Sequence, residues 1–198
     1  MKIAFEMGEV ELDMNSNPDR MTEKEFVEFC LQNPDLNIER ESDGTTFLMS
    51  PIHFLSSRHE ARLQRAVMAW NEATDLGEVF TSSAGFTLNN KAVRSPDVSW
   101  ISHERINALP IEEYERFAHI APDFVAEMRS HSDSIRRLKN KMQEYIDCGC
   151  RLAFLIDPVQ RKAWVYRPGK EIYEAAFSEN LSGYDVLPGF ELDLNIFQ

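Results

Sequence analysis

A glutamate stands in the middle of an apolar stretch, residues 121–130, whose side chains alternate as in a buried strand. With a period of two, Glu127 and Arg129 lie on one face of that strand. A carboxylate inside a sheet costs several kcal/mol unless it is paired, protonated or bound to a metal ion. Glu127 is therefore either the partner of a base such as Arg129 or a functional acid. Asp123 lies four residues upstream on the same face, and a separation of about 13 Å is too long for the two acids to share one ion.

A second acid, Asp97, lies in the apolar stretch 95–101. Pro96 can stand only at the start or the edge of a strand, which places Asp97 at the mouth of this one. Val98 and Trp100 then point to the other face. Two carboxylates on neighbouring strands can hold Mg²⁺ or Mn²⁺, which prefer oxygen ligands. Such an ion polarises a phosphate and helps to ionise a water molecule, so the pair predicts in-line hydrolysis of a phosphodiester bond in DNA.

A lysine could complete this site from the helix that follows the strand of Glu127. This helix is capped by Asp133 or Ser134, and its apolar stripe faces the sheet. The stripe consists of Ile135, Leu138, Met142, Tyr145 and Ile146. Lys139 and Lys141 lie on opposite borders of the stripe, each about 80° from its centre, so each could reach the sheet edge. Only one can face the carboxylates, where an ammonium group would orient the water and offset developing charge; the other is expected to be solvated.

The remaining elements are predicted from capping, turn and alternation signals. They are a hairpin or extended tail over 3–14, a capped helix over 22–32, a hairpin over 38–50, a helix over 57–74, short strands over 78–81 and 86–88, a helical or irregular connection over 102–120, a strand over 151–157, paired strands over 162–167 and 170–175, and an extended piece over 184–194. Glu39 and Glu41 share a face and are expected to be solvated rather than catalytic. Glu60 could be only the acid of a capping box that begins at Ser57. Strand, helix and strand in the second half imply a right-handed parallel crossover.

The composition fits a single domain of a cytoplasmic protein. The chain has 198 residues, of which 43% are hydrophobic, enough to bury a core. No run approaches the ~20 apolar residues of a membrane span, and the acidic amino terminus lacks the features of a signal peptide. Three cysteines form an odd and sparse set, which suits reduced thiols.

The charge is unevenly distributed. A net charge of −12 argues against loose, non-specific nucleic-acid binding, because that binding depends on Lys and Arg neutralising phosphates. A basic cluster nevertheless lies beside Glu127, with Asp133 as its only acid. Its members are Arg129, Arg136, Arg137, Lys139 and Lys141.

Other hydrolytic chemistries fit the sequence less well. It contains no Gly-x-Ser-x-Gly elbow, no Gly-x-x-x-x-Gly-Lys-Ser/Thr phosphate loop and no His-Glu-x-x-His pair. The five histidines are scattered, and His59 is expected to be a surface histidine.

Short motifs are spread along nearly the whole chain. They are NPDL at 33–36, IER at 38–40, DG at 43–44, MSP at 49–51, GF at 85–86, SPDVSW at 95–100, PDFVAE at 122–127, SDS at 132–134, KMQEY at 141–145, LIDP at 155–158, YRPG at 166–169 and LPGF at 187–190. Through these motifs the sequence resembles the Uma-two endonuclease-like proteins, bacterial members of the PD-(D/E)XK restriction-endonuclease-like superfamily.

The resemblance implies a restriction-endonuclease-like core with Asp97 and Glu127 as metal ligands. It favours Lys141 as the lysine of the site, because the family's lysine stands four residues before a tyrosine, as Lys141 stands before Tyr145. It also gives Glu60 the place of the acid on the superfamily's first helix.

Arg129 departs from the superfamily pattern, in which a lysine normally follows the glutamate by two positions. This departure is consistent with a lysine that has moved onto the helix, although Arg129 could instead bind phosphate. Because arginine stays protonated it cannot act as a base, so any role of Arg129 in the site would be electrostatic.

The sequence therefore predicts a mixed α/β protein: a restriction-endonuclease-like domain over 21–198 with flanking helices, and an N-terminal extension with an added hairpin over 1–20. Our first functional hypothesis is a Mg²⁺- or Mn²⁺-dependent endonuclease that acts on duplex DNA as a homodimer, with no membrane association. Its candidate site residues are Asp97, Glu127, Lys141, Arg129 and Glu60. The alternative is a catalytically silent nucleic-acid-binding or protein-interaction module on the same fold, suggested by the net charge and by Arg129.

Overall fold

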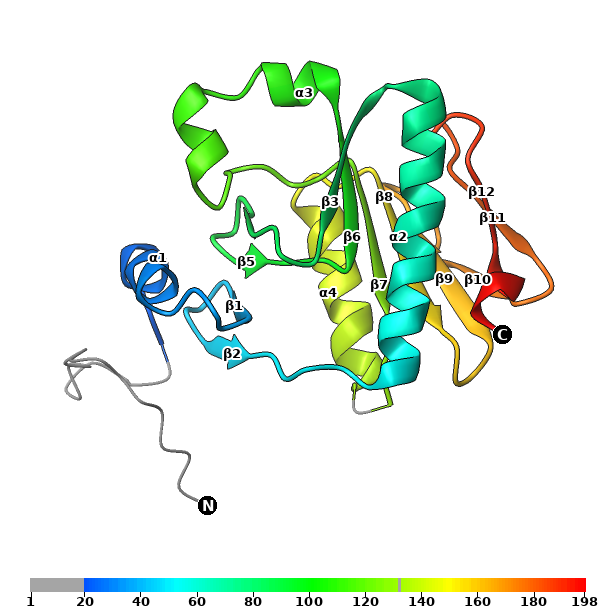
Figure 1. Ribbon diagram of the computed structural model, residues 1–198, viewed down its shortest axis with the longest axis horizontal. Coiled ribbons are helices and arrows are strands. Elements are labelled where there is room, and N and C mark those ends of the chain that lie inside the picture. The colour runs from blue at the N-terminus through cyan, green and yellow to red at the C-terminus, as the bar shows by residue number, and fades with distance from the viewer. Residues whose placement is uncertain (1–19, 132) are drawn as a thin grey trace.

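The computed structural model describes residues 20–131 and 133–198 (Figure 1). Its helices are α1 (Glu23–Gln32), α2 (Phe54–Thr74), α3 (His103–Asn107) and α4 (Ile135–Asp147), with the 3₁₀ helices η1 (Ile111–Glu115) and η2 (Leu194–Phe197). Its strands are β1 (Ile38–Arg40), β2 (Thr46–Leu48), β3 (Gly77–Thr81), β4 (Phe86–Thr87), β5 (Val93–Arg94), β6 (Val98–Ser102), β7 (Phe124–Met128), β8 (Leu152–Asp157), β9 (Lys162–Tyr166), β10 (Tyr173–Ala176), β11 (Asn180–Ser182) and β12 (Glu191–Asp193). The predicted hairpin over 3–14 lies outside the described residues, and the division at residue 20 stays a prediction.

The main sheet has six strands in the order β10-β9-β8-β7-β6-β3. β7 and β8 run parallel and are connected through α4, whereas the other neighbouring pairs are antiparallel. The predicted parallel pairing of the strands before and after the helix is thus confirmed, as is the mixed α/β class. β7 lies between its parallel neighbour β8 and its antiparallel neighbour β6, so residues of three strands meet around its carboxyl end.

The alternation along β7 distributes its side chains between two cores. Phe124 and its alternate residues pack in the core that includes Leu63 and Val67 of α2. Val125, one residue along, packs in the core that includes Met142 and Tyr145 of α4. α2 and α4 therefore cover opposite faces of the sheet (Figure 1). Glu127 shares the parity of Val125, which directs it to the face of α4.

A smaller sheet with the order β2-β1-β5-β4 lies beside the main one. α1 begins with the predicted capping box, in which the Thr22 amide donates to Glu25 (2.7 Å) and the Thr22 hydroxyl accepts from the Glu25 amide (3.3 Å). Its buried Phe26 packs with Ile38 of β1 and Val93 of β5. α1 is thereby attached to the smaller sheet, and the predicted helix over 22–32 and hairpin over 38–50 are both confirmed.

The start of α2 differs from the prediction. The helix begins at Phe54, three residues before Ser57, and its N-cap is His53. The Ser57 amide already donates to the His53 carbonyl (3.0 Å), so helical hydrogen bonding is established before Ser57 is reached. Ser57 is therefore not the cap, and Glu60 is an interior helical residue rather than the acid of a capping box.

The carboxyl-terminal segment also differs from the extended piece expected over 184–194. β11 and β12 form an antiparallel pair, and the residues between them turn back on themselves. The Leu187 amide donates to the Gly183 carbonyl (2.9 Å), and a Cβ at Gly183 would lie 2.3 Å from the Leu187 carbonyl oxygen. This close approach requires glycine and closes a turn, so that only β12 of the segment expected to be extended is a strand. Across residues 20–131 and 133–198, no helix has the length and apolar content needed to span a membrane.

Candidate active site

Asp97 and Glu127 lie side by side at the junction of β6 and β7. The antiparallel register pairs Val98 with Ala126, so the next pair outward brings Asp97 opposite Glu127. The Asp97 Oδ2 atom accepts a hydrogen bond from the Met128 amide (2.7 Å), which fixes this acid against the end of β7. The two acids that the sequence singled out are thus adjacent across neighbouring strands.

Glu127 is nearly inaccessible, with 4% of its surface exposed. Its Oε1 atom lies 2.7 Å from the Lys141 Nζ atom and accepts a hydrogen bond from the Tyr145 hydroxyl (3.1 Å). Burial raises the pKa of Glu127, while the ammonium group of Lys141 acts in the opposite direction. Desolvation therefore favours the protonated form of Glu127, whereas the Lys141 ammonium group favours the ionised form.

The two candidate lysines separate as the helical geometry allowed. Lys141 projects from α4 to the carboxylates, whereas the Lys139 Nζ atom lies 4.0 Å from the centre of the Trp164 ring. Burial alone would lower the pKa of Lys141, but the carboxylates of Glu127 and Glu39 hold it above its ordinary value. Lys141 therefore stays protonated beside Glu127. Of the two lysines that the sequence allowed, Lys141 is the one that faces the carboxylates.

Glu39 of β1 is the second carboxylate on Lys141, and the expectation that it would be solvated is wrong. It is 2% exposed, and its Oε1 atom lies 2.8 Å from the Lys141 Nζ atom and 2.9 Å from the Ser95 amide nitrogen. Burial acts to raise the pKa of Glu39, but the charges of Lys141 and Arg94 hold it below its ordinary value. The sequence contains little sign of this, because Arg94 follows only two apolar residues, Ala92 and Val93, and does not stand out as a buried base.

Arg94 of β5 joins this group from the other side and has 3% of its side chain exposed. Its guanidinium group meets three carboxylates, those of Glu39 (3.5 Å), Glu41 and Glu144. Glu144 comes from α4, so Arg94 connects the smaller sheet with the helix that carries Lys141. The buried side chains of Arg94, Lys141, Glu39 and Glu127 are thus each paired with a group of opposite charge.

Glu60 approaches the same carboxylates from α2. Burial, together with the negative charges of Glu127 and Asp133, raises its pKa to about 7. Burial and the charges of Glu127 and Glu60 likewise raise the pKa of Asp97 well above its usual range. The structure therefore brings Asp97, Glu127 and Glu60 within electrostatic reach of one another.

Arg129 is directed elsewhere. Its Nη1 atom lies 2.6 Å from the Oδ2 atom of Asp157, an acid at the end of β8 with no exposed surface. Its Nε atom also donates to the Asp133 carbonyl oxygen (3.3 Å). This pairing closes the end of the parallel strand pair, and it agrees with Lys141 rather than Arg129 filling the lysine position.

Two further expectations are settled by the structure. Asp123 lies at the opposite end of β7 from Glu127, where it accepts from the Ser102 amide (3.0 Å) and pairs with Arg105 (3.0 Å), so the two acids are indeed too far apart to act together. His59 is 5% exposed and packs edge-on against Phe197. It is therefore a core histidine rather than a surface one.

Asp97 and Glu127 together could supply two of the ligands of a metal ion. In the part of the chain that the structure describes, no group of three or more His, Cys, Asp or Glu side chains is arranged to hold a metal ion. Mg²⁺ commonly takes only one or two carboxylates, with water and substrate phosphate as its other ligands. The charge of Glu127 raises the pKa of both Asp97 and Glu60, and the charge of Glu60 raises that of Asp97; a divalent cation would relieve that repulsion. The residues present therefore fit such an ion.

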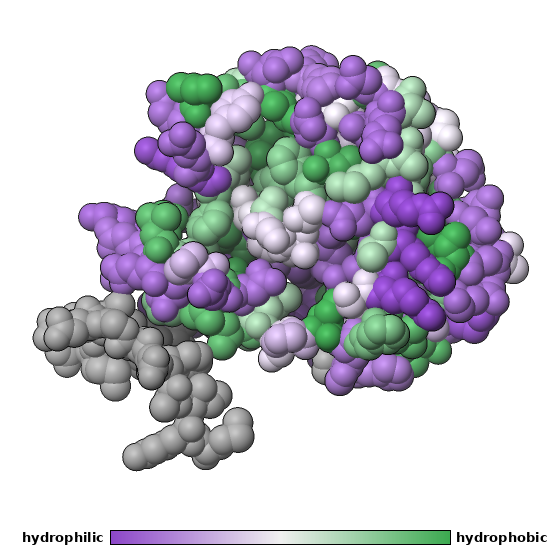
Figure 2. All heavy atoms as spheres, viewed as in Figure 1, coloured by the Kyte–Doolittle hydropathy of each residue, from purple (hydrophilic) through white to green (hydrophobic). Residues whose placement is uncertain are grey.

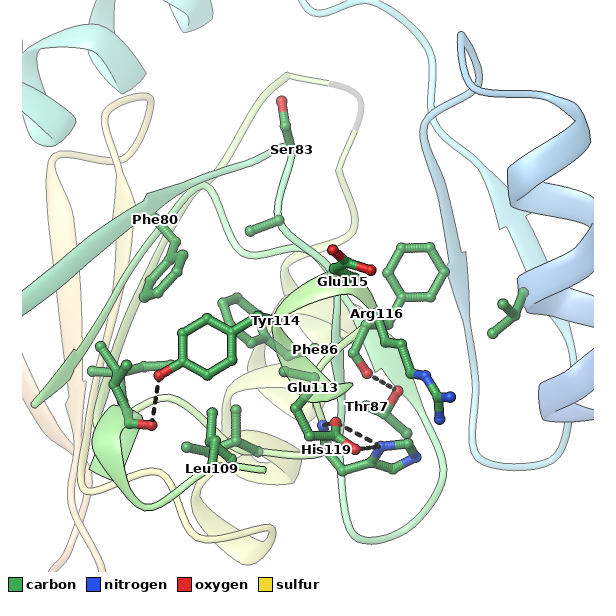
Figure 3. A pocket seen from close by; sticks show the side chains of 18 of the residues that line it. Phe80, Ser83, Phe86, Thr87, Leu109, Glu113, Tyr114, Glu115, Arg116 and His119 are labelled. Atoms are coloured by element: carbon green, nitrogen blue, oxygen red, sulfur yellow. Dashed lines mark hydrogen bonds and ion pairs between the residues drawn. The ribbon is translucent and has the colours of Figure 1, made fainter. Parts of the chain in front are cut away.

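A separate cavity of about 1210 Å³ lies between α1, β3 and the segment containing α3 and η1. Figure 3 shows Phe80, Phe86 and Tyr114 around it, with the Tyr114 hydroxyl donating to the Ile106 carbonyl (3.1 Å). Figure 2 shows the hollow between α1 and α3 as a largely apolar surface with polar residues around it. Asp97, Glu127 and Lys141 do not line this cavity, so it is distinct from the carboxylate site.

The fold has a close counterpart among solved structures. The crystal structure of a "putative nuclease belonging to DUF820" from Anabaena variabilis superposes with a TM-score of 0.74 at 19% sequence identity, covering 89% of this chain and 97% of that chain. At 19% identity this likeness establishes the fold alone. The protein therefore has the same fold as that crystal structure. Residues 23–195 also match the model of the Uma2 family, described as "putative restriction endonuclease". This chain belongs to the Uma2 family, as its motifs predicted. No curated protein matches it.

Removing the ammonium group of Lys141 should destabilise the fold. Lys141→Met leaves Glu39 and Glu127 buried without their shared cation, so we expect a loss of about 3–5 kcal/mol in the free energy of unfolding. Urea denaturation at neutral pH measures this loss. In the matched control, Lys139→Met removes only the contact with Trp164 and should cost about 1 kcal/mol or less. Equal losses in the two variants would contradict the assigned pairing.

Glu60 should give the stability a distinct pH dependence. Its pKa of about 7 in the folded protein exceeds the ordinary value of 4.5, so protonated Glu60 contributes stability that is present below pH 4.5 and is lost as the pH rises through 7. Because Glu60→Gln cannot ionise, its stability relative to the wild type should increase between about pH 4 and pH 8. Urea denaturation across this range measures the difference, and Glu72→Gln, at an exposed position on the same helix, is the control. A constant difference for Glu60→Gln would show that the burial argument is wrong.

Proposed function

We propose that this protein is a metal-dependent endonuclease that hydrolyses phosphodiester bonds of duplex DNA. The observation that carries the proposal is the adjacency of Asp97 and Glu127 across β6 and β7, with the Lys141 ammonium group 2.7 Å from Glu127. Two adjacent carboxylates can hold a metal ion, and a fixed cation beside them can offset the charge that develops when a phosphate diester is hydrolysed. Membership in the Uma2 family supports the same reaction.

Asp97 and Glu127 would hold Mg²⁺ or Mn²⁺ in this proposal. When bound, the ion would polarise the scissile phosphate and lower the pKa of water. The carboxylates are held ready for it by neighbouring groups of the chain. The Met128 amide fixes Asp97, and the Tyr145 hydroxyl, whose pKa is raised well above its usual range by burial and so keeps its proton, fixes Glu127.

Lys141 and Glu60 have different roles in the proposed reaction. Lys141 stays protonated between its two carboxylates and so cannot act as a base; its ammonium group orients the attacking water and offsets negative charge that develops on the phosphate. Glu60, whose carboxyl group changes protonation near pH 7, can accept the proton that the water releases. In this proposal Lys141 of α4 stabilises charge and Glu60 of α2 transfers the proton.

The proposal extends to the partner and the assembly. A duplex has two strands of opposite direction, and two sites related by a twofold axis are the simplest means of cutting both, so we propose a homodimer. We further propose that the protein acts in the cytoplasm, as its sequence composition predicts.

Cleavage of a panel of supercoiled, linear and single-stranded DNA and of RNA, with Mg²⁺ or Mn²⁺, tests the proposed activity. The wild type should cut duplex DNA, and Glu127→Gln should lose at least about 100-fold in rate because a neutral amide cannot replace the carboxylate. Glu112→Gln, at an exposed position on η1, should cut as the wild type does. Equal cleavage by Glu127→Gln and the wild type would place the activity in another site or in a contaminant.

A catalytically silent binding module is the second candidate, and the internal pairing of Glu127 with Lys141 favours it, because the acid already has a cation. Titration calorimetry with Mg²⁺ or Mn²⁺ separates the two candidates. Binding to the wild type that is lost in Asp97→Asn supports the endonuclease. Absence of binding supports the module.

A further inference from the structure

We propose that Glu39 of β1 is a positioning residue of the active site, which holds both Lys141 and the segment that leads into Asp97. This inference rests on the proposed endonuclease function and adds to it a residue from the smaller sheet. Neither the superfamily pattern of acids and lysine nor the apolar stretches around Asp97 and Glu127 include this position.

A single oxygen of Glu39 makes the decisive contacts. Its Oε1 atom lies 2.8 Å from the Lys141 Nζ atom and 2.9 Å from the amide nitrogen of Ser95. Ser95 stands two residues before Asp97 and directly follows β5. Glu39 therefore ties α4, which carries the lysine, to the segment that carries the first of the two proposed metal ligands.

Burial makes these contacts strong constraints. The side chain of Glu39 is 3% exposed, and that of Lys141 is 11% exposed. The second Glu39 oxygen, Oε2, lies 3.5 Å from the Nη1 atom of Arg94. The buried carboxylate of Glu39 is stabilised by the two cations Lys141 and Arg94. The flexible side chain of Lys141 is in turn restrained by the carboxylates of Glu39 and Glu127 at its end.

The second carboxylate also matters for the availability of Glu127. If Glu127 were the sole acid beside Lys141, the ammonium group would neutralise the carboxylate that the proposed function needs for a cation. With Glu39 on the other side, Lys141 keeps a counter-ion of its own. Glu39 thus allows the lysine to remain charged and in place while Glu127 interacts with another positive group.

Glu41 offers a natural comparison, because it lies near Glu39 and also pairs with Arg94. Its other described ion pair is with Arg137 (3.5 Å), on the outer side of α4, rather than with Lys141. A role limited to balancing Arg94 would therefore be shared by Glu39 and Glu41. A role in positioning Lys141 belongs to Glu39.

The experiment compares Glu39→Gln with Glu41→Gln in the full chain. The first measurement is the NMR order parameter of the Lys141 side chain without added metal, with its signal assigned by its loss in Lys141→Met. We expect Glu39→Gln to increase the mobility of the Lys141 side chain and Glu41→Gln to leave it unchanged. This readout does not depend on cleavage, so it still decides the positioning role if the wild type proves to cut no nucleic acid.

The second measurement is the steady-state kinetics of DNA cleavage with Mg²⁺. Glu39→Gln should lower kcat about 10–100-fold, because small displacements of a charged group are costly at the reacting centre, with KM changed less than about threefold. Glu41→Gln should keep the kcat of the wild type. If Glu39→Gln does not fold, Glu39→Asp keeps a negative charge near Arg94 but shortens the reach to Lys141, and it should show the same increase in mobility and decrease in kcat. Unchanged Lys141 mobility in the folded Glu39 variant, or equal effects of Glu39→Gln and Glu41→Gln, would overturn the proposal.

Discussion

The pairing of buried carboxylates with Lys141 and Arg94 is the constraint on which the two sheets depend. Glu127 is 4% exposed and Glu39 is 2% exposed, and neither could remain charged at such a site without a cation within contact distance. Lys141 meets both acids and Arg94 meets Glu39. Because these four groups come from β7, β1, α4 and β5, the charge balance of the site fixes the smaller sheet against the main one.

The order of the strands explains how the site is assembled from distant parts of the chain. The parallel pair β7 and β8 requires a crossover, and the crossover helix α4 returns over the face on which Glu127 lies. The antiparallel register of β6 and β7 places Asp97 beside Glu127, although the connection between these strands is long and contains α3 and η1. The helix on the opposite face, α2, contributes Glu60. The sheet therefore places Asp97 and Glu127 side by side where β6 begins and β7 ends. The helices α4 and α2 add Lys141 and Glu60, whose charges shift the pKa values of these acids.

The parts of this arrangement that were predictable are those with a long periodic signal. Alternation over 121–130 indicated the strand and the direction of Glu127, and the helical stripe limited the lysine to two positions. Glu39 was not predictable, because a three-residue strand has too short a period to distinguish a buried face from a solvated one. Its burial results from Lys141 and Arg94, which lie 102 and 55 residues away. The start of α2 was misplaced for a local reason: a capping signal within a helix does not prevent the helix from beginning one turn earlier.

The raised pKa values of the acids have a consequence for any cation that binds there. Near neutral pH, Glu60 with its pKa of about 7 carries a proton for part of the time, and burial and like charge also raise the pKa of Asp97. A cation that uses the ionised carboxylates must displace those protons, so binding is coupled to proton release. The apparent affinity then rises with pH, and the heat of binding contains the ionisation heat of the buffer that takes up the protons. Protons and any metal ion that binds there would therefore compete for the same carboxylate oxygens.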